Sequence, residues 1–140
     1  MAGREEIVAA LSQFALFADL SPPQLEMIAG ELGEAYFADG TRILRQGLSG
    51  SGLYFILDGS CSVVVNGEKR AELKRGEFFG EVSALLERSP TADVVANGAV
   101  RCLVLPAPEV HKFLIGHPPL MFRMLQVQAS RLAAANAWRG

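Results

Sequence analysis

This chain has few cysteines and histidines and little net charge. Its 140 residues include two cysteines and two histidines, and the formal net charge is −2. The concentrated positive field that duplex nucleic acid requires is therefore not expected. His111 and His117 have no cluster of cysteine or aspartate near them, which argues against a metal site. Cys61 and Cys102 are far apart in the sequence, and we expect buried free thiols in preference to a disulfide.

Long apolar runs and catalytic signatures are missing as well. No stretch approaches the roughly eighteen uncharged residues of a membrane span, and the opening "MAGREEIVAAL" lacks the apolar region of a secretion signal. No serine lies in a G-x-S-x-G pattern, and the loop "GLSGSG" at 47–52 lacks the Lys-Ser/Thr ending of a P-loop. We therefore expect a cytoplasmic protein with no membrane span and no enzymatic activity.

The length and the turn content favour one β-rich domain. A chain of 140 residues, half of them apolar, can bury one core but is too short for two domains. Short β-prone runs follow one another from about residue 34, separated by turn signals such as Asp58-Gly59 and Asn66-Gly67. Asn-Gly tolerates positive φ and predicts a tight hairpin. Several short strands at nearly regular spacing indicate a sandwich or barrel.

Helices are predicted at both ends of the chain, over residues 1–33 and 107–140. Near the start, Ser21 can cap a helix whose first position is Pro22, and Gln24 lies where a capping box needs Glu or Gln.

The last helix, from about Pro118, is apolar on more than one side, so we expect it to cover a partner or a ligand. Its arginines, Arg123, Arg131 and Arg139, have no acidic neighbours in sequence and predict a solvated helix face.

The stretch "GEFFGEVSALLERSPTADVVA" at 76–96 carries the main functional signal. A turn at Phe79-Gly80-Glu81 leads into a short helix within a β context, and a helix start offers unpaired N–H groups to an anion. Gly80 would let a ligand approach the backbone, and Glu81 could accept a hydroxyl such as a ribose 2′-OH. A phosphate together with a free 2′-OH indicates a 3′,5′-cyclic nucleotide. Taken alone, these residues fit a turn glycine and a surface acid equally well.

These phrases resemble the cyclic nucleotide-binding domain family, which includes catabolite activator proteins, regulatory subunits of protein kinase A and cyclic nucleotide-gated channels. The resemblance covers nearly the whole chain, through "LFADLSPPQLEMIAGEL", "FADGTRILRQG", "LYFILDGSCSVV" and "LKRGEFFGEVSALL". It implies an antiparallel, jelly-roll-like β-roll over 34–106, with helices over 1–33 and 107–140 packed beside it.

The resemblance also implies a phosphate-binding cassette over 79–92, similar to "FGE-x-[AS]-L-L-x(3)-P-R-[ST]-A". It assigns the 2′-OH to Glu81 and the cyclic phosphate to the amides of the three residues that follow it. The ligand, cyclic AMP or cyclic GMP, would need no cofactor and no metal. The implied ligand-binding residues are Phe79, Gly80, Glu81, Val82, Ser83, Ala84, Thr91 and Ala92.

The final helix resembles the family helix that pairs two protomers and closes over the base, which implies a homodimer and a polar base contact at Asn136.

One position departs from the cassette pattern. Pro90 stands where the pattern has the arginine that pairs with the phosphate, and Arg88 lies two positions earlier. A charge-assisted hydrogen bond contributes roughly 1.5–3 kcal/mol, so its loss would weaken binding by about one to two orders of magnitude. Asp93, where the family commonly has a neutral threonine, adds negative charge.

Three hypotheses follow from this departure. Arg88 substitutes for the missing arginine, or the pocket takes a less charged ligand, or the fold is degenerate and acts as a dimerisation or interaction module. The chain could also be the sensor part of a longer transcription regulator. We predict a non-catalytic regulatory domain that binds a cyclic nucleotide and couples its occupancy to movement of the C-terminal helix, acting on an effector protein still to be identified.

Overall fold

A computed structural model describes residues 3–48 and 52–136 of the chain. Before the sheet come α1 (Arg4–Ser12), a 3-10 helix (Ala15–Phe17) and α2 (Pro22–Glu31). The capping box predicted for α2 is confirmed, since the Gln24 amide donates to Ser21 Oγ and the Ser21 amide donates to Gln24 Oε1. The box fixes the start of α2 by satisfying backbone donors that a helix N-terminus leaves unpaired.

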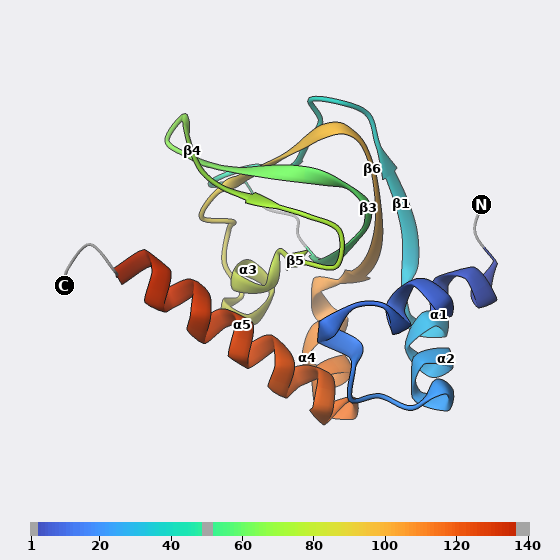
Figure 1. Ribbon diagram of the computed structural model, residues 1–140. Helices are drawn as coiled ribbons and strands as arrows, with labels where there is room; N and C mark the ends of the chain where they lie inside the picture. The colour runs from blue at the N-terminus through green and yellow to red at the C-terminus, as the bar shows by residue number, and fades with distance from the viewer. Residues whose placement is uncertain (1–2, 49–51, 137–140) are drawn as a thin grey trace.

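The middle of the described chain forms one antiparallel, six-stranded sheet. The strand order is β1-β6-β3-β4, with β2 also paired to β6 and β5 also paired to β3. Figure 1 shows the sheet curling into a roll above a layer of helices, so the predicted β-roll with flanking helices is confirmed. The strands are β1 (Gly33–Phe37), β2 (Arg42–Leu44), β3 (Gly52–Val65), β4 (Glu68–Leu73), β5 (Phe78–Phe79) and β6 (Asp93–Pro106).

The curved sheet is built mainly from two long strands, β3 and β6, whereas the sequence predicted several short ones. The runs before and after Asp58-Gly59 are one strand, because this pair forms a bulge where the β3–β6 register shifts. Gly59 has φ of 92° there, and an added Cβ would lie 2.5 Å from the Ala99 carbonyl oxygen. Only glycine fits such a bend. The turn at Asn66-Gly67, by contrast, joins β3 to β4 as predicted, with positive φ at both residues.

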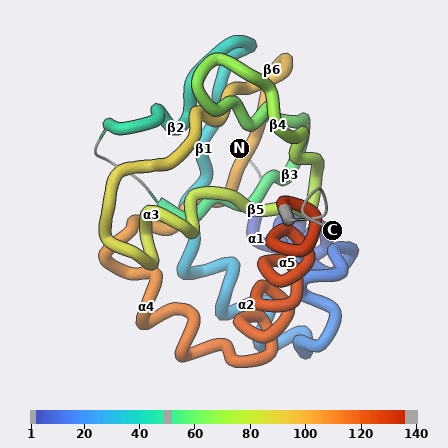
Figure 2. The backbone as a smooth tube through the Cα atoms, turned by 90° about the vertical axis from the view of Figure 1, so that its left-hand side faces the viewer, coloured from blue at the N-terminus to red at the C-terminus, as the bar shows by residue number. Residues whose placement is uncertain are grey.

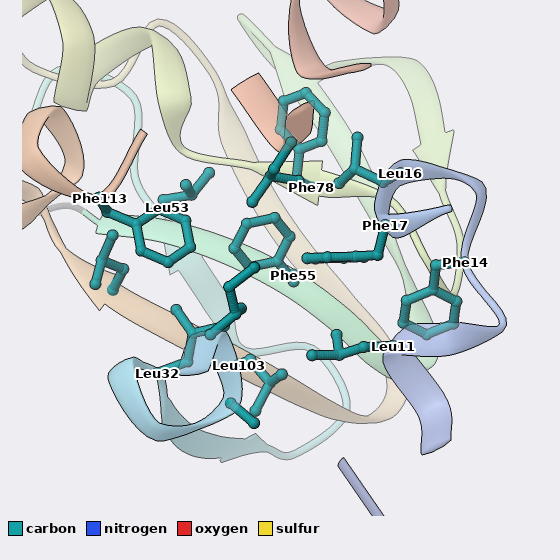
Figure 3. Close-up of a cluster of buried hydrophobic side chains, with 14 of the residues drawn as sticks. Leu11, Phe14, Leu16, Phe17, Leu32, Leu53, Phe55, Phe78, Leu103 and Phe113 are labelled. Carbon is teal, nitrogen blue, oxygen red and sulfur yellow. The ribbon is translucent and has the colours of Figure 1, made fainter. Parts of the chain in front are cut away.

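Two apolar clusters hold the domain together. One lies between the helices and the roll, where Phe17, Phe55 and Phe78 meet (Figure 3). The other fills the inside of the roll and includes both cysteines, which are free thiols as predicted. Burial disfavours the charged thiolate and raises the pKa of Cys61 to about 11 and that of Cys102 to about 12.

Three helices complete the described chain: α3 (Glu81–Leu86), α4 (Ala107–Gly116) and α5 (Pro118–Asn136). His117, between α4 and α5, is buried, and its Nε2 lies 3.0 Å from Glu31 Oε1, which ties this junction to the end of α2. From there α5 runs below the roll, past β5 and α3 (Figure 1), and Figure 2 shows it nearly end-on. No helix in the described ranges has the length and apolarity to cross a bilayer.

Candidate functional site

A cavity of about 690 Å³ lies where α3, the loop after it, β4 and the end of α5 come together. Its walls combine three kinds of surface: the start of α3, apolar side chains of the roll, and small residues of α5. The lining residues are Leu44, Val63, Arg70, Ala71, Glu72, Leu73, Glu77, Gly80, Glu81, Val82, Ser83, Pro90, Thr91, Ala92, Val94, Arg131, Ala134 and Ala135.

Gly80 shapes the wall of the cavity at the start of α3. Its φ is 90°, and an added Cβ would lie 1.9 Å from the Gly52 carbonyl oxygen, so no other residue fits without moving the backbone. The Gly80 carbonyl accepts from the Ala84 amide at 3.2 Å, so the amides of Glu81, Val82 and Ser83 are the first donors of the helix and have no acceptor within it. No backbone acceptor for these three amides is found among the described residues.

Glu81 is a buried carboxylate, only 5% exposed, and α5 satisfies it. Gln128 Nε2 donates to Glu81 Oε2 at 2.6 Å, and Arg131 Nη1 lies 3.7 Å from Glu81 Oε1. A charged group this deeply buried requires such partners, because burial without them is costly. The cavity wall and the C-terminal helix are therefore joined through the carboxylate that the sequence assigned to the ligand.

Arg123 and Arg131 of α5 have partners that the sequence prediction of a solvated helix face did not include. Arg131 Nη2 donates to the Phe78 carbonyl at 2.8 Å, and its guanidinium lies 4.4 Å from the centre of the Phe78 ring. Arg123 pairs with Asp19, Nε to Oδ2, at 2.7 Å. These partners are 53 and 104 residues away in sequence, which is why local charge patterning did not reveal them. Arg139 lies outside the described residues.

Six of the predicted ligand-binding residues line the cavity, and two do not. Those at the cavity are Gly80, Glu81, Val82, Ser83, Thr91 and Ala92. Phe79 instead stacks on Tyr54, with ring centres 4.8 Å apart, and Ala84 packs against the core. Arg88 is exposed and is not part of the lining, and the Asn136 side chain lies outside what the structure describes.

Sequence reasoning expected the last helix to cover a ligand, but it missed the two residues of α5 that reach Glu81. Gln128 and Arg131 are three residues apart and so lie on the same face of the helix, where they reach Glu81 together. Two polar residues at this spacing on one face of the helix are the signal that could have indicated a polar contact. It could not have named Glu81 as the partner, since the contact depends on how α5 folds back on the roll.

The formal charges of the lining residues are mainly negative. Glu72, Glu77 and Glu81 oppose Arg70 and Arg131. Pro90 itself is buried in the wall, and its carbonyl accepts from the Gly47 amide at 2.9 Å. No group of acidic, histidine and cysteine side chains in the described ranges is arranged to hold a metal ion.

Comparison with known proteins agrees with the geometry. Residues 34–117 match the profile of the cyclic nucleotide-binding domain. Glutaminase 2 of Bradyrhizobium diazoefficiens is 33% identical over 132 residues, 91% of this chain and 21% of that protein. The cAMP-dependent protein kinase regulatory subunit of Mucor circinelloides f. lusitanicus is 34% identical over 99 residues, 68% of this chain and 23% of that protein. The chain thus spans less than a quarter of the length of either relative.

Solved structures extend the similarity. The regulatory subunit of a cAMP-independent protein kinase A from Trypanosoma brucei has a TM-score of 0.79 and 27% identity, over 90% of this chain and 46% of that one. A triple mutant of that subunit, in which one change replaces threonine by arginine, is described as bound to cAMP in the A site. It has a TM-score of 0.66 and 26% identity over 89% of this chain and 51% of that one. With a profile match over more than half of its residues and the same roll, this chain belongs to the cyclic nucleotide-binding domain family.

Proposed function

We propose that this domain is a non-catalytic regulatory module that binds cyclic AMP or cyclic GMP in the cavity beside α3. One observation carries the proposal: the buried carboxylate of Glu81 borders this cavity next to three amides without backbone acceptors in the described chain. An anion suits the unpaired amides and a sugar hydroxyl suits the carboxylate. A cavity of about 690 Å³ is within the usual range for a ligand of this size.

The contacts of α5 support a coupling between occupancy and helix position. Gln128 Nε2 already donates to Glu81 Oε2, so a ribose hydroxyl that binds this oxygen has to share it or replace the amide. Either event changes the free energy with which α5 is held against α3. Ligand would thus shift the population of α5 positions, and a protein attached to or contacting α5 would be the effector.

Titration calorimetry with cyclic AMP, cyclic GMP and 2′-deoxy-cyclic AMP tests the binding site. If Glu81 accepts the 2′-OH, removing that hydroxyl should weaken binding by about tenfold, the equivalent of one hydrogen bond to a charged group. Glu81→Ala should remove the preference for the ribose form, whereas Glu109→Ala, a change at an exposed carboxylate of α4, should keep it. Absence of heat with either cyclic nucleotide, or equal affinity for the deoxy compound, would contradict the proposal.

A second candidate function is dimerisation through α5, with or without ligand. Phe122, Leu125 and Leu132 are 57%, 62% and 63% exposed and, with Ala129, are spaced three and four residues apart along one stripe of the helix. Such spacing suits pairing with a second helix. Sedimentation velocity should show a dimer that Leu125→Glu converts to a monomer; a monomer at all concentrations of the unmodified chain would exclude this function.

A further inference from the structure

We propose that Arg131 of α5 supplies the positive charge that meets the anionic group of the ligand, in place of the arginine that Pro90 replaces. The inference rests on the proposed function and identifies a specificity-determining residue for it. It also differs from the hypothesis drawn from the sequence, in which Arg88 takes this role.

The described cations around the cavity leave Arg131 as the strongest candidate. Arg88 is exposed and is not part of the lining. Arg70 does line the cavity, but its side chain is 59% exposed and lies 3.5 Å from Glu68 on the same strand. Its charge is therefore well screened by water. The Arg131 side chain is half as exposed, at 31%, and its charge acts across a less solvated space.

Arg131 is held in place mainly by groups that do not neutralise it. Its Nη2 donates to the carbonyl of Phe78, its Nη1 donates to Gln128 Oε1 at 3.3 Å, and the guanidinium stacks on the Phe78 ring. A guanidinium has five N–H donors, so donors remain after these two bonds. The side chain is thus positioned in advance, which lowers the entropy cost of binding an anion.

Among the described residues, the carboxylate that lies within 4 Å of the Arg131 guanidinium is that of Glu81, and the pair is loose. The separation of 3.7 Å is longer than a hydrogen bond, and the other oxygen of Glu81 is bound by Gln128. A ligand whose hydroxyl binds Glu81 would consequently have its neighbouring groups close to the Arg131 guanidinium. Without a cation there, the negative charge of Glu81 would repel an anionic ligand, and Arg131 offsets that repulsion.

The test compares cyclic AMP with adenosine, which keeps the ribose hydroxyl but carries no charge. By calorimetry, Arg131→Gln should lower affinity for cyclic AMP by about 10- to 100-fold and change affinity for adenosine by less than about threefold. Arg131→Lys, which keeps the charge, should retain most of the preference for cyclic AMP. Arg123→Gln, on the same helix, and Arg88→Gln serve as matched controls and should leave the preference unchanged.

Adding Pro90→Arg to the Arg131→Gln variant should restore the preference for cyclic AMP, because a cation again lines the cavity; a purely structural loss would not be rescued. The inference is overturned if Arg131→Gln leaves the preference intact, if both ligands weaken equally, or if Arg88→Gln is the variant that removes it. In those cases the proposed function stands as long as the unmodified chain binds cyclic AMP. If the unmodified chain binds neither compound, both the proposed function and this inference fail.

Discussion

Replacing Pro90 by arginine should convert the cavity into a tighter cyclic nucleotide site. Pro90 is buried in the cavity wall, and the hydrogen bond that its carbonyl accepts from Gly47 involves the backbone alone, so the new side chain need not break it. The arginine would bring a cation to a lining in which three glutamates face two arginines. Its guanidinium can form the bidentate pair that suits a phosphate.

The size of the effect follows from the charges already present. A hydrogen bond between charged groups contributes roughly 1.5–3 kcal/mol, which corresponds to about 10- to 150-fold in affinity. Because Arg131 already lines the cavity, we expect the lower end, about tenfold, in the unmodified background. The free protein should lose about 0.4–1 kcal/mol of stability, since the proline no longer restricts the unfolded chain.

Calorimetric titration with cyclic AMP and cyclic GMP measures this effect directly. The matched control is Pro90→Gln, which makes the same backbone change and adds a polar side chain without charge. If Pro90→Arg binds the cyclic nucleotides no more tightly than Pro90→Gln does, the side chain at position 90 does not reach the anionic group of the ligand. The assignment of the cassette over 79–92 would then be wrong, whatever the affinity of the unmodified chain.

Three further outcomes test the fold around the site. In chemical denaturation, Gly98→Ala should lower the free energy of unfolding by about 1–2 kcal/mol, because Gly98 has a positive φ, although an added Cβ would meet no other atom. Gly80→Ala should lower it further, because the added Cβ would also lie 1.9 Å from a backbone oxygen. Equal losses for the two variants would mean that the backbone around Gly80 relaxes freely. Thiol reagents at pH 8 should leave Cys61 and Cys102 unmodified in the folded protein, because burial raises both pKa values to about 11 and 12 and keeps the reactive thiolate rare; rapid labelling without denaturant would contradict the packing of the roll. Ser21→Ala should lower the free energy of unfolding by about 1 kcal/mol through loss of the cap of α2, and an unchanged midpoint would show that the capping box is not formed.

Local chemistry in the sequence predicted much of the architecture. The cap at Ser21 and the hairpin at Asn66-Gly67 depend on residues within three positions of one another, and both are present. Asp58-Gly59 has an equally strong local turn signal, yet it forms a bulge within β3, because pairing with β6 outweighs local preference there.

The candidate site divides in the same way. Gly80 and Glu81 stand out in the sequence because a turn glycine and an acid precede a short helix, and both line the cavity. The sequence indicated that the last helix covers a partner or a ligand, but not which of its side chains reach Glu81. Gln128 and Arg131 reach Glu81 only after β6, α4 and the turn at His117 have carried the chain back to the roll. Sequence patterns thus identify one wall of the cavity, while the opposite wall is a product of tertiary folding.

The central position of β6 has a consequence for biosynthesis. This strand pairs with β1, β2 and β3, all of which leave the ribosome before it, and the pair Gly33–Val104 joins residues far apart in the chain. Contacts of such long range form slowly, and the sheet cannot close until residues 93–106 have left the ribosome. If translation stalled just after residue 92, the nascent chain would contain the whole cassette but could not form the cavity. Its apolar strands would be exposed, and chaperones would have to bind them.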